Sequence, residues 1–318
     1  MNRAETGGAA NQVRNVYVHS ALFYGSDEEY LATLVPFVTD GLALGQPVAV
    51  AVPGERLRVL SAALNGAADG VKMVDMTVAG RNPGRIIPSV LRGFADRHAG
   101  VHVRIIGEPI WAGRTAVEYP ACVQHEALIN YAFAGRDVTI VCPYDTKGLD
   151  DRALADAHAT HPVLWSADRR RASPWYAPDV VLDRYNQPLH DAAADADGLA
   201  VTSVTEVAAA RRFATERASH LGLDDEQIPD LRLIVTELVT NSLVHTDGGC
   251  RLRVWHDHSH LICEVRDTGR LTDPLAGRHP ALEGQKGGRG LLLVHELADL
   301  VRTHTSPHGT IIHALLRL

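Results

Sequence analysis

Residues 228–246 read IPDLRLIVTELVTNSLVHT and have the spacing of an amphipathic helix. Glu237, Asn241 and His245 stand four residues apart and line a face of their own. An asparagine amide competes with the helix backbone for hydrogen bonds, so its position inside a strong helix favours a role for the side chain. Another face repeats at i, i+3, i+4 and i+7 and is predicted to pack on a core through Leu231, Ile234, Val235, Leu238 and Ser242.

The next stretch with candidate binding residues is CEVRDTGR, residues 263–270. It places Asp267 and Gly269 at the end of a predicted strand, in a turn. A carboxylate there can accept a hydrogen bond from an adenine amino group, and a glycine lets the base come close to the backbone. The pattern therefore indicates one side of a nucleotide pocket.

A glycine-rich helix start follows in KGGRGLLLVHELAD, residues 286–299. The free N–H groups and the dipole at such a start suit a polyphosphate, and Lys286 and Arg289 add positive charge. Residues 270–286, with two prolines, are long and irregular enough to be predicted as a mobile lid. A Mg²⁺ ion keeps several waters and shares phosphate oxygens, so one amide oxygen from Asn241 is a sufficient protein ligand.

The order of these three features resembles that of the GHKL ATPase superfamily, with ELVTNSLVH as the N box, DTG as the G1 box and GGRGL as the G2 box. Within it, residues 201–318 look most like the anti-sigma-factor serine/threonine kinases. The resemblance implies a Bergerat α/β sandwich, Mg²⁺ on Asn241 and a catalytic base at Glu237. It implies an ATP site formed by Asn241, Asp267, Gly269, Lys286, Gly288, Arg289, Gly290, Leu291 and Thr310. The sequence departs from the pattern at Arg270, where the family often has a second glycine.

Two other functions use the same ATP-binding core. One is a histidine kinase, which needs a helical hairpin with an acceptor histidine directly before the core, and residues 186–203 are too short for it. The other is a binding switch in which ATP only sets the lid and no phosphate is transferred. Direct transfer to a hydroxyl group on another protein is the favoured hypothesis.

The first half of the chain alternates strands with helices. Short runs rich in valine and isoleucine at 16–24, 47–53, 71–76, 101–108 and 137–143 are separated by helical segments near 27–45, 55–65, 85–98 and 118–134. Strands joined by helical crossovers lie parallel, so residues 15–185 are predicted to form a parallel α/β domain. Residues 1–14 are predicted to be a flexible terminus.

A linker is predicted at residues 186–200, where NQPLHDAAADADG is small, acidic and without apolar periodicity. Beyond it, 204–220 and 288–300 have helical spacing, RLRVWHD and LICEVRD read as paired strands, and GTIIHALLRL reads as a final strand. The second domain is therefore predicted to place helices against a mostly antiparallel sheet.

The first domain has no phosphate-binding loop, because its first strand–helix turn reads HSALFYGSDEEYL without a GxxxxGK[ST] or GxGxxG pattern. Ligands of parallel α/β folds sit outside the carboxyl ends of the strands. We predict a ligand site there, formed by His19, Tyr24, Arg104, Glu108, Trp111, Glu126, Cys142, Tyr144, Asp145 and His161, with Ser20, Asn130 and His158 beside them.

The pattern HSALFY, VRIIGEPIW, HEALINYAF and VCPYD over residues 15–165 resembles the MEDS sensory domain, a RecA-like module without the phosphate loop. The residues leave its ligand open. A small organic molecule held by Arg104 and Glu126 is favoured, and a metal or haem bound by Cys142 with His19 and His161 is the alternative.

The composition bounds these hypotheses. A chain of 318 residues with 46% hydrophobic and 22% charged residues is expected to fold as two globular domains. The net charge of −7 argues against direct nucleic-acid binding, and four cysteines without a C-x-x-C pair indicate reduced thiols. We find neither a signal peptide nor an apolar run of the roughly 18 to 20 residues that span a membrane, so a cytoplasmic protein is expected.

Together, the two resemblances imply a bacterial transcription regulator of the stress-response type: a signal-responsive anti-sigma factor with serine/threonine kinase activity. Its implied partners are a sigma factor and a STAS-type antagonist of the anti-sigma factor, and its implied state is a homodimer. ATP and Mg²⁺ are the implied cofactors.

Overall fold

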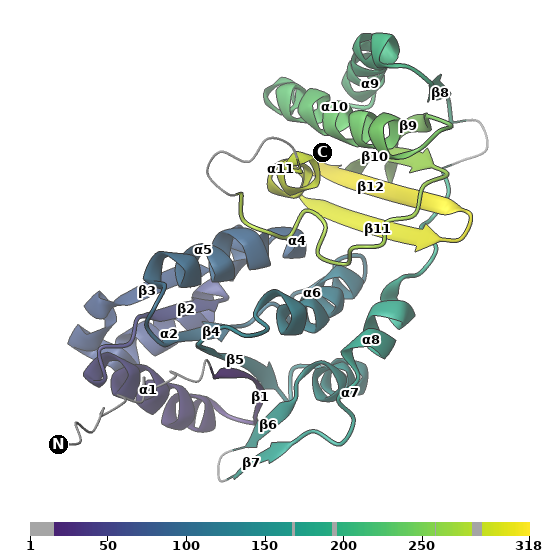
Figure 1. Cartoon of the computed structure of the whole chain (residues 1–318). Helices are drawn as coiled ribbons and strands as arrows, with labels where there is room; N and C mark the ends of the chain where they lie inside the picture. The colour runs from purple at the N-terminus through teal and green to yellow at the C-terminus, as the bar shows by residue number, and fades with distance from the viewer. Residues whose placement is uncertain (1–15, 167–168, 193–195, 258, 282–287) are drawn as a thin grey trace, which may run out of the picture.

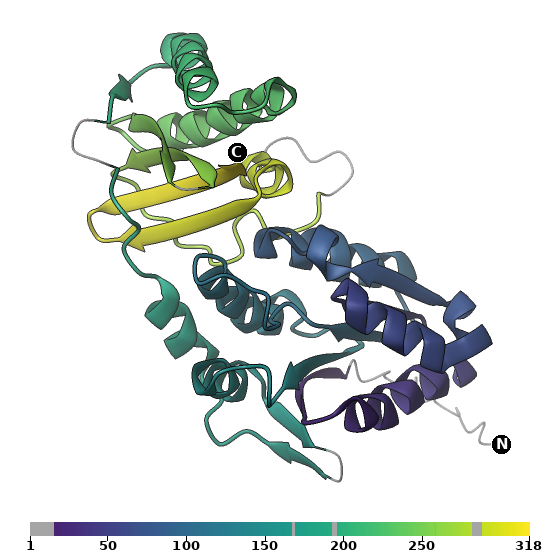
Figure 2. The same cartoon turned by 180° about the vertical axis from the view of Figure 1, so that it is seen from behind.

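The computed structural model of the chain describes residues 16–166, 169–192, 196–257, 259–281 and 288–318. It has two β-sheets, each covered by its own helices (Figures 1 and 2). The predicted flexible terminus, residues 1–14, and residues 282–286 of the predicted lid, which include Lys286, lie outside the described residues. Among the helices that are described, none combines the length and the apolar character needed to cross a bilayer.

The first sheet has the strand order β3-β2-β4-β5-β1-β6-β7. All its pairings are parallel except that of β6 with β7, so the predicted parallel α/β class is confirmed. The sequence did not predict the last two strands. The strands are β1 (Tyr17–Tyr24), β2 (Val48–Val52), β3 (Val71–Asp75), β4 (Val103–Gly107), β5 (Val138–Asp145), β6 (Val163–Ser166) and β7 (Arg169–Ala172).

Helices cover both faces of this sheet. The helices α1 and α2 pack on one face, and α6, α7 and α8 pack on the other. The single helix predicted near 85–98 is instead broken into α4, a π-helical turn at Ile86–Arg92, α5 and a 3₁₀ turn at Asp96–His98. The α-helices are α1 (Asp27–Ala43), α2 (Gly54–Leu64), α3 (Met76–Ala79), α4 (Pro83–Arg85), α5 (Gly93–Ala95), α6 (Tyr119–Ala132), α7 (Asp151–Thr160) and α8 (Pro178–Tyr185).

The second sheet is antiparallel, with the order β11-β12-β10-β9-β8, and α9, α10 and α11 pack on one of its faces. This confirms the predicted sandwich. Strand β8 begins at Gly198, within the linker predicted at residues 186–200. Strand β11 begins at Leu300, the last residue of the helix predicted at 288–300. The elements are β8 (Gly198–Val201), α9 (Val207–His220), α10 (Ile228–His245), β9 (Cys250–Asp257), β10 (His260–Asp267), α11 (Gly290–Leu297), β11 (Leu300–Ser306) and β12 (Gly309–Arg317).

The remaining face of the second sheet packs on the first domain. Ile262, Leu300 and Leu315 form a buried cluster with Ala121 of helix α6, and Trp255 packs against it. Because side chains alternate along a strand, the neighbours of Ile262 point the other way, into the core under α9 and α10. Helix α6 therefore lies between the two sheets and contacts both (Figure 1).

Candidate functional site

Helix α10 presents its polar face as the sequence predicted. All five residues predicted to face the core are buried: Leu231, Ile234, Val235, Leu238 and Ser242. Glu237 and Asn241 are half-buried on a different face, and His245 is exposed. The helix thus carries a carboxylate and an amide one turn apart on one face, and the Asn241 amide lines a cavity.

Asp267 is the last residue of β10 and lies opposite Thr310 of β12. Its carboxylate accepts a hydrogen bond of 2.5 Å from the Ser242 hydroxyl and one of 2.9 Å from the Gly269 N–H. Two donors from separate elements therefore hold this carboxylate in one orientation, which is the preorganisation that a ligand acceptor needs. The role of Ser242 was missed, since its place on the apolar face suggested only packing.

Thr310 fixes the turn that follows Asp267. Its hydroxyl donates to the Gly269 carbonyl at 2.8 Å, and the Leu271 N–H lies 3.2 Å from the same hydroxyl oxygen. Gly309 has a φ of 137°, and a Cβ there would lie 2.0 Å from the Asp267 carbonyl oxygen. The chain therefore needs glycine at this position to bring the two strand ends together.

Gly290, the first residue of α11, lies directly against the polar pair of α10. A Cβ on Gly290 would lie 2.7 Å from Oε2 of Glu237 and 3.1 Å from Nδ2 of Asn241. The N–H groups at the start of α11 are thus brought next to the carboxylate and the amide, in a position suited to an anionic ligand. Gly288, just before it, has a φ of 73°, which favours glycine.

These features surround one cavity of about 590 Å³. It is lined by residues of α10, the β10 end, α11 and β12, and by the described part of the predicted lid, residues 270–281. Arg270, where the sequence departs from the G1 pattern, also lines it. Of the predicted ATP-site residues, the cavity brings together Asn241, Asp267, Gly269, Gly288, Gly290, Leu291 and Thr310.

The ligand residues predicted in the first domain fall into separate places. Tyr24, Glu108 and Asp145 lie at the carboxyl ends of their strands, as expected. His19 is the third residue of β1 and Cys142 the fifth of β5, so both lie within the sheet rather than at its end. They face α6 and α7, where they meet Glu126 and His161.

Arg104 and Glu126 lie on opposite faces of the first sheet and do not form the shared ligand site that was favoured. The Arg104 guanidinium donates to Gln46 Oε1 at 2.6 Å and to the Phe37 carbonyl at 2.8 Å, on the α1 side. Glu126 belongs to α6, which packs on the other side. Trp111 lies in the loop after β4, with the Arg114 guanidinium 3.9 Å from its ring centroid.

Arg56 contacts the side chains that lie at the carboxyl ends of the strands. It was not predicted from the sequence as a site residue. Its guanidinium pairs with Asp27 and lies 3.6 Å from Asp145 and 5.3 Å from the ring centroid of Tyr24. Glu108 beside it is 3% exposed and has a carboxyl oxygen without a hydrogen-bond partner among the described residues. Burial raises the pKa of Glu108 to about 8, partly opposed by Arg56, so this carboxyl group is largely neutral at pH 7.

Comparison with known proteins agrees with this division. The family model "MEDS: MEthanogen/methylotroph, DcmR Sensory domain" matches residues 18–162, and the model "Histidine kinase-like ATPase domain" matches residues 201–315. The chain joins a MEDS domain to a histidine kinase-like ATPase domain. A curated relative, the anti-sigma F factor of Pasteuria penetrans, is 28% identical over 105 residues, which cover 29% of this chain and 70% of that protein.

The MEDS domain holds the C-terminal end of α11 in the ATPase domain. The Asn82 amide, just before α4, donates to the carbonyl oxygens of His295 at 2.9 Å and Ala298 at 3.3 Å. A Cβ on Gly84 would lie 1.9 Å from the His295 ring, so this ring packs directly on the Gly84 backbone without room for a side chain. The helix whose start borders the ATP cavity therefore has its far end fixed by the other domain.

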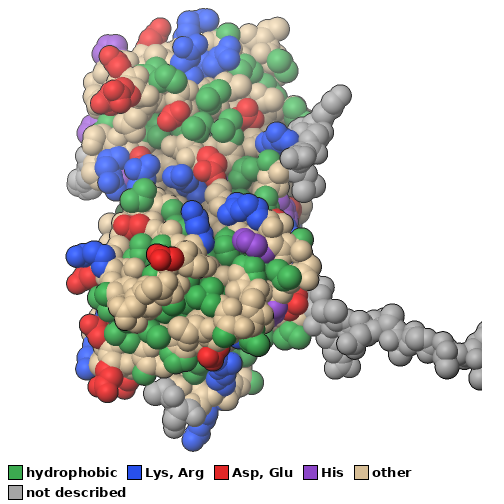
Figure 3. All heavy atoms as spheres, turned by 90° about the vertical axis from the view of Figure 1, so that its left-hand side faces the viewer, with side chains coloured by type: hydrophobic (Ala, Val, Ile, Leu, Met, Phe, Trp, Pro, Cys, Tyr) green, Lys and Arg blue, Asp and Glu red, His purple; other side chains and the backbone are tan. Residues whose placement is uncertain are grey.

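Charged pairs surround this contact. Arg81 pairs with Asp299 at 2.5 Å and Arg85 with Glu296 at 3.2 Å. Figure 3 shows basic and acidic side chains gathered near the junction of the two domains on one face of the molecule. The Asp299 carboxylate is 4% exposed and the Arg81 side chain 40% exposed, so this pair is only partly shielded from water.

The lid also contacts the MEDS domain. Leu275 packs into the core of that domain, and the buried Arg278 guanidinium lies 3.5 Å from the Pro83 carbonyl oxygen. Burial lowers the pKa of Arg278 to about 10, and the side chain stays charged at neutral pH. Lid residues 275–278 are thus held between the two domains, next to the ATP cavity.

Proposed function

We propose that this protein is a signal-responsive anti-sigma factor that uses ATP to phosphorylate a serine or threonine on a STAS-type antagonist. The observation that carries the proposal is one cavity at the glycine-rich start of α11, lined by Asn241 and Asp267, with the Glu237 carboxylate beside Gly290. The similarity to the anti-sigma F factor of Pasteuria penetrans supports the choice of partners. These partners are a sigma factor and the STAS-type antagonist of the anti-sigma factor. A homodimer in the cytoplasm is part of the same proposal.

Each residue has a chemical task in this reaction. The Asp267 carboxylate, fixed by Ser242 and Gly269, accepts a hydrogen bond from the adenine amino group. The Asn241 amide oxygen is the protein ligand for Mg²⁺, which when bound neutralises phosphate charge. Glu237 is close enough to Gly290 to orient and deprotonate the incoming hydroxyl at the phosphate-binding helix start.

Control by the MEDS domain is the second part of the proposal. The contacts of Asn82 with α11 and of Arg278 with Pro83 connect that domain to both borders of the ATP cavity. A ligand that binds one arrangement of this junction better than another shifts the balance between them. In this proposal a signal changes the rate of phosphorylation by changing the position of the lid.

The deciding experiment incubates the full chain with γ-labelled ATP, Mg²⁺ and a panel of STAS proteins. Acid-stable label on a STAS serine or threonine is the expected result. ATP-dependent capture of a partner without any transfer would replace the kinase with a binding switch. Acid-labile label on the chain itself would replace it with a histidine kinase.

A further inference from the structure

Four side chains from four separate elements meet in the interior of the MEDS domain. They come from β1, α6, β5 and the residue after α7, and all four are buried. One nitrogen, oxygen or sulfur atom of each lies within 4.8 Å of those of the others. The group is His19, Glu126, Cys142 and His161.

Three of the distances between these atoms are close to those in the ligand shell of a tetrahedral ion. Nε2 of His19 lies 3.3 Å from Oε2 of Glu126 and 3.4 Å from Sγ of Cys142. Nε2 of His161 lies 3.2 Å from the same Glu126 oxygen. Bonds of about 2.0 to 2.3 Å from a tetrahedral zinc ion place neighbouring ligand atoms about 3.3 to 3.8 Å apart.

The hydrogen bond at Nδ1 of His19 leaves the Nε2 lone pair pointing into the cluster. The Asn130 amide nitrogen donates to the carbonyl oxygens of Thr160 at 2.8 Å and Ala127 at 3.1 Å, which turns the amide oxygen toward His19. That oxygen lies 3.1 Å from Nδ1 of His19 and can only accept, so Nδ1 carries the proton. The lone pair of the neutral ring is therefore on Nε2, facing Glu126 and Cys142.

His161 is held in the same way. Its Nδ1 lies 2.9 Å from the Ala157 carbonyl oxygen, which only accepts, so Nδ1 is again the donor and Nε2 points into the cluster. Metal-binding histidines commonly donate their second ring N–H to a carbonyl or carboxylate oxygen, which fixes the tautomer and the ring orientation. Both histidines of this cluster have that outer partner.

Several polar atoms of the cluster are buried without a hydrogen-bond partner in the described part of the chain. Both carboxyl oxygens of Glu126 and Nε2 of His161 have no hydrogen-bond partner with suitable geometry among the described residues. Burying polar atoms without partners costs free energy, and a bound cation would give these atoms a partner.

We propose that His19, Glu126, Cys142 and His161 bind one divalent transition-metal ion, with Zn²⁺ as the best fit. Two nitrogens, one oxygen and one sulfur form a set of ligands that zinc accepts in tetrahedral geometry. The carboxylate and the thiolate balance the two charges of the ion, so the buried site is neutral as a whole. Four donors within 4.8 Å of one another enclose a single ion and leave no space between them for a haem.

The test uses the untagged full chain, stripped with a chelator and reloaded under anaerobic conditions with Zn²⁺ or Co²⁺. We expect one bound zinc per chain by mass spectrometry of the metal. With Co²⁺ we expect the ligand-field bands of a tetrahedral site and a thiolate-to-cobalt charge-transfer band. Cys142→Ser removes the charge-transfer band, and Asn130→Ser, which removes the outer partner of His19, weakens metal binding by about 10- to 100-fold.

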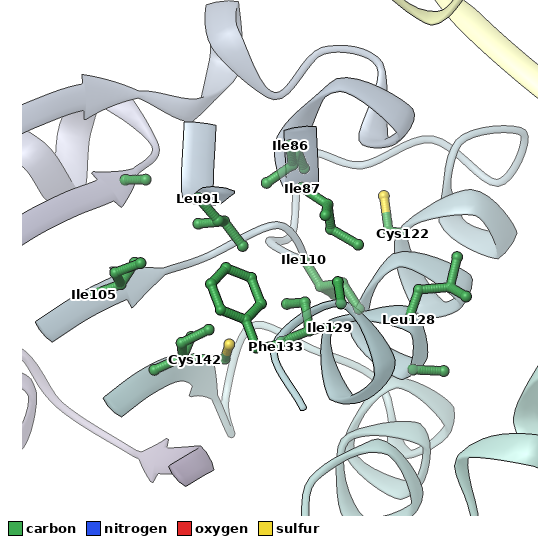
Figure 4. Packing of buried hydrophobic residues seen from close by; sticks show 14 of the residues in the cluster. Ile86, Ile87, Leu91, Ile105, Ile110, Cys122, Leu128, Ile129, Phe133 and Cys142 are labelled. Atoms are coloured by element: carbon green, nitrogen blue, oxygen red, sulfur yellow. The ribbon is translucent and has the colours of Figure 1, made fainter. Parts of the chain in front are cut away.

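The matched control is Cys122→Ser. Cys122 is also a buried thiol, but it lies on α6 next to Ile87, apart from Cys142 (Figure 4), and its loss leaves the charge-transfer band unchanged. A wild-type chain that is folded by circular dichroism but binds neither metal overturns the proposal, as does a band that survives Cys142→Ser. Neither measurement involves ATP, so the outcome is independent of the proposed kinase activity.

Discussion

Replacing Asp267 by asparagine tests the adenine pocket most directly. The carboxylate offers two acceptor oxygens, one to the Ser242 hydroxyl at 2.5 Å and one to the Gly269 N–H at 2.9 Å. Asparagine keeps the shape but turns one oxygen into an NH₂ donor. The Gly269 N–H can only donate, so the remaining oxygen turns toward it and the new NH₂ group meets the adenine amino group, donor to donor.

The loss is that of a hydrogen bond to a charged acceptor, about 1.5 to 3 kcal/mol. Since 1.4 kcal/mol is a factor of ten, Asp267→Asn should weaken ATP binding by about 10- to 100-fold. Titration calorimetry with a non-hydrolysable ATP analogue and Mg²⁺ measures this. Asp257→Asn, at the exposed far end of the same hairpin, is the matched control and should change nothing. A folded Asp267→Asn chain with wild-type affinity would refute the placement of adenine.

Three more substitutions test other parts of the molecule. Glu237→Gln should keep ATP affinity in calorimetry and lower transfer to the STAS partner by about 10²- to 10⁴-fold, and full transfer would exclude Glu237 as the base. Gly84→Ala places a methyl group 1.9 Å from the His295 ring and should lower the free energy of unfolding in urea by about 1 to 3 kcal/mol. Gly66→Ala, with open space around it, is the control and should change this free energy little. Equal effects of the two substitutions would contradict the tight domain junction. The pKa of Glu108 is about 8 in the folded chain, against an ordinary value of 4.5. Its contribution to the free energy of unfolding is therefore fully present below pH 4.5 and is lost as the pH rises to 8. The wild type should therefore lose up to about 5 kcal/mol relative to Glu108→Gln over this range, and a difference independent of pH would refute it.

The ATP cavity could be predicted from the sequence because its parts follow local rules. The face of α10 with Glu237 and Asn241 comes from helical periodicity, and the glycines come from turns and close contacts that exclude a Cβ. The hydrogen bond from Ser242 to Asp267 depends on two elements 25 residues apart, so no local pattern contains it. Strand β11 was missed because its apolar residues directly continue the α11 pattern.

The ligand residues predicted in the MEDS domain do not all lie together in the structure. The strand positions were found, but the face to which each side chain points depends on the register of the strand within the sheet. One residue of offset separates Arg104, on the α1 side, from Ile105, which packs under α6. The cluster of His19 and Cys142 thus lies within the sheet layers, and Arg104 is on the other side.

The domain junction left no sequence signal. Asn82 caps α4 through the Gly84 N–H, which is an ordinary local task, while its amide nitrogen donates to α11 more than 200 residues away. Arg278 lies in a loop, where an arginine is normally solvated, and is nevertheless buried. Such contacts depend on how two folded domains meet, which no residue spacing within either domain specifies.

Helix α6 joins the two proposed sites. It carries Glu126 in the buried cluster, and five residues earlier, about 7.5 Å along the helix, it packs Ala121 against Ile262 and Leu315 of the ATPase sheet. Those two residues belong to β10 and β12, the strands that carry the paired residues Asp267 and Thr310 at the adenine side of the cavity. Packed interiors shift between discrete arrangements rather than bend continuously. An ion bound by Glu126 in the proposed metal site would act on a helix that contacts the strands carrying Asp267 and Thr310. We therefore expect metal occupancy to change nucleotide affinity at the proposed ATP site.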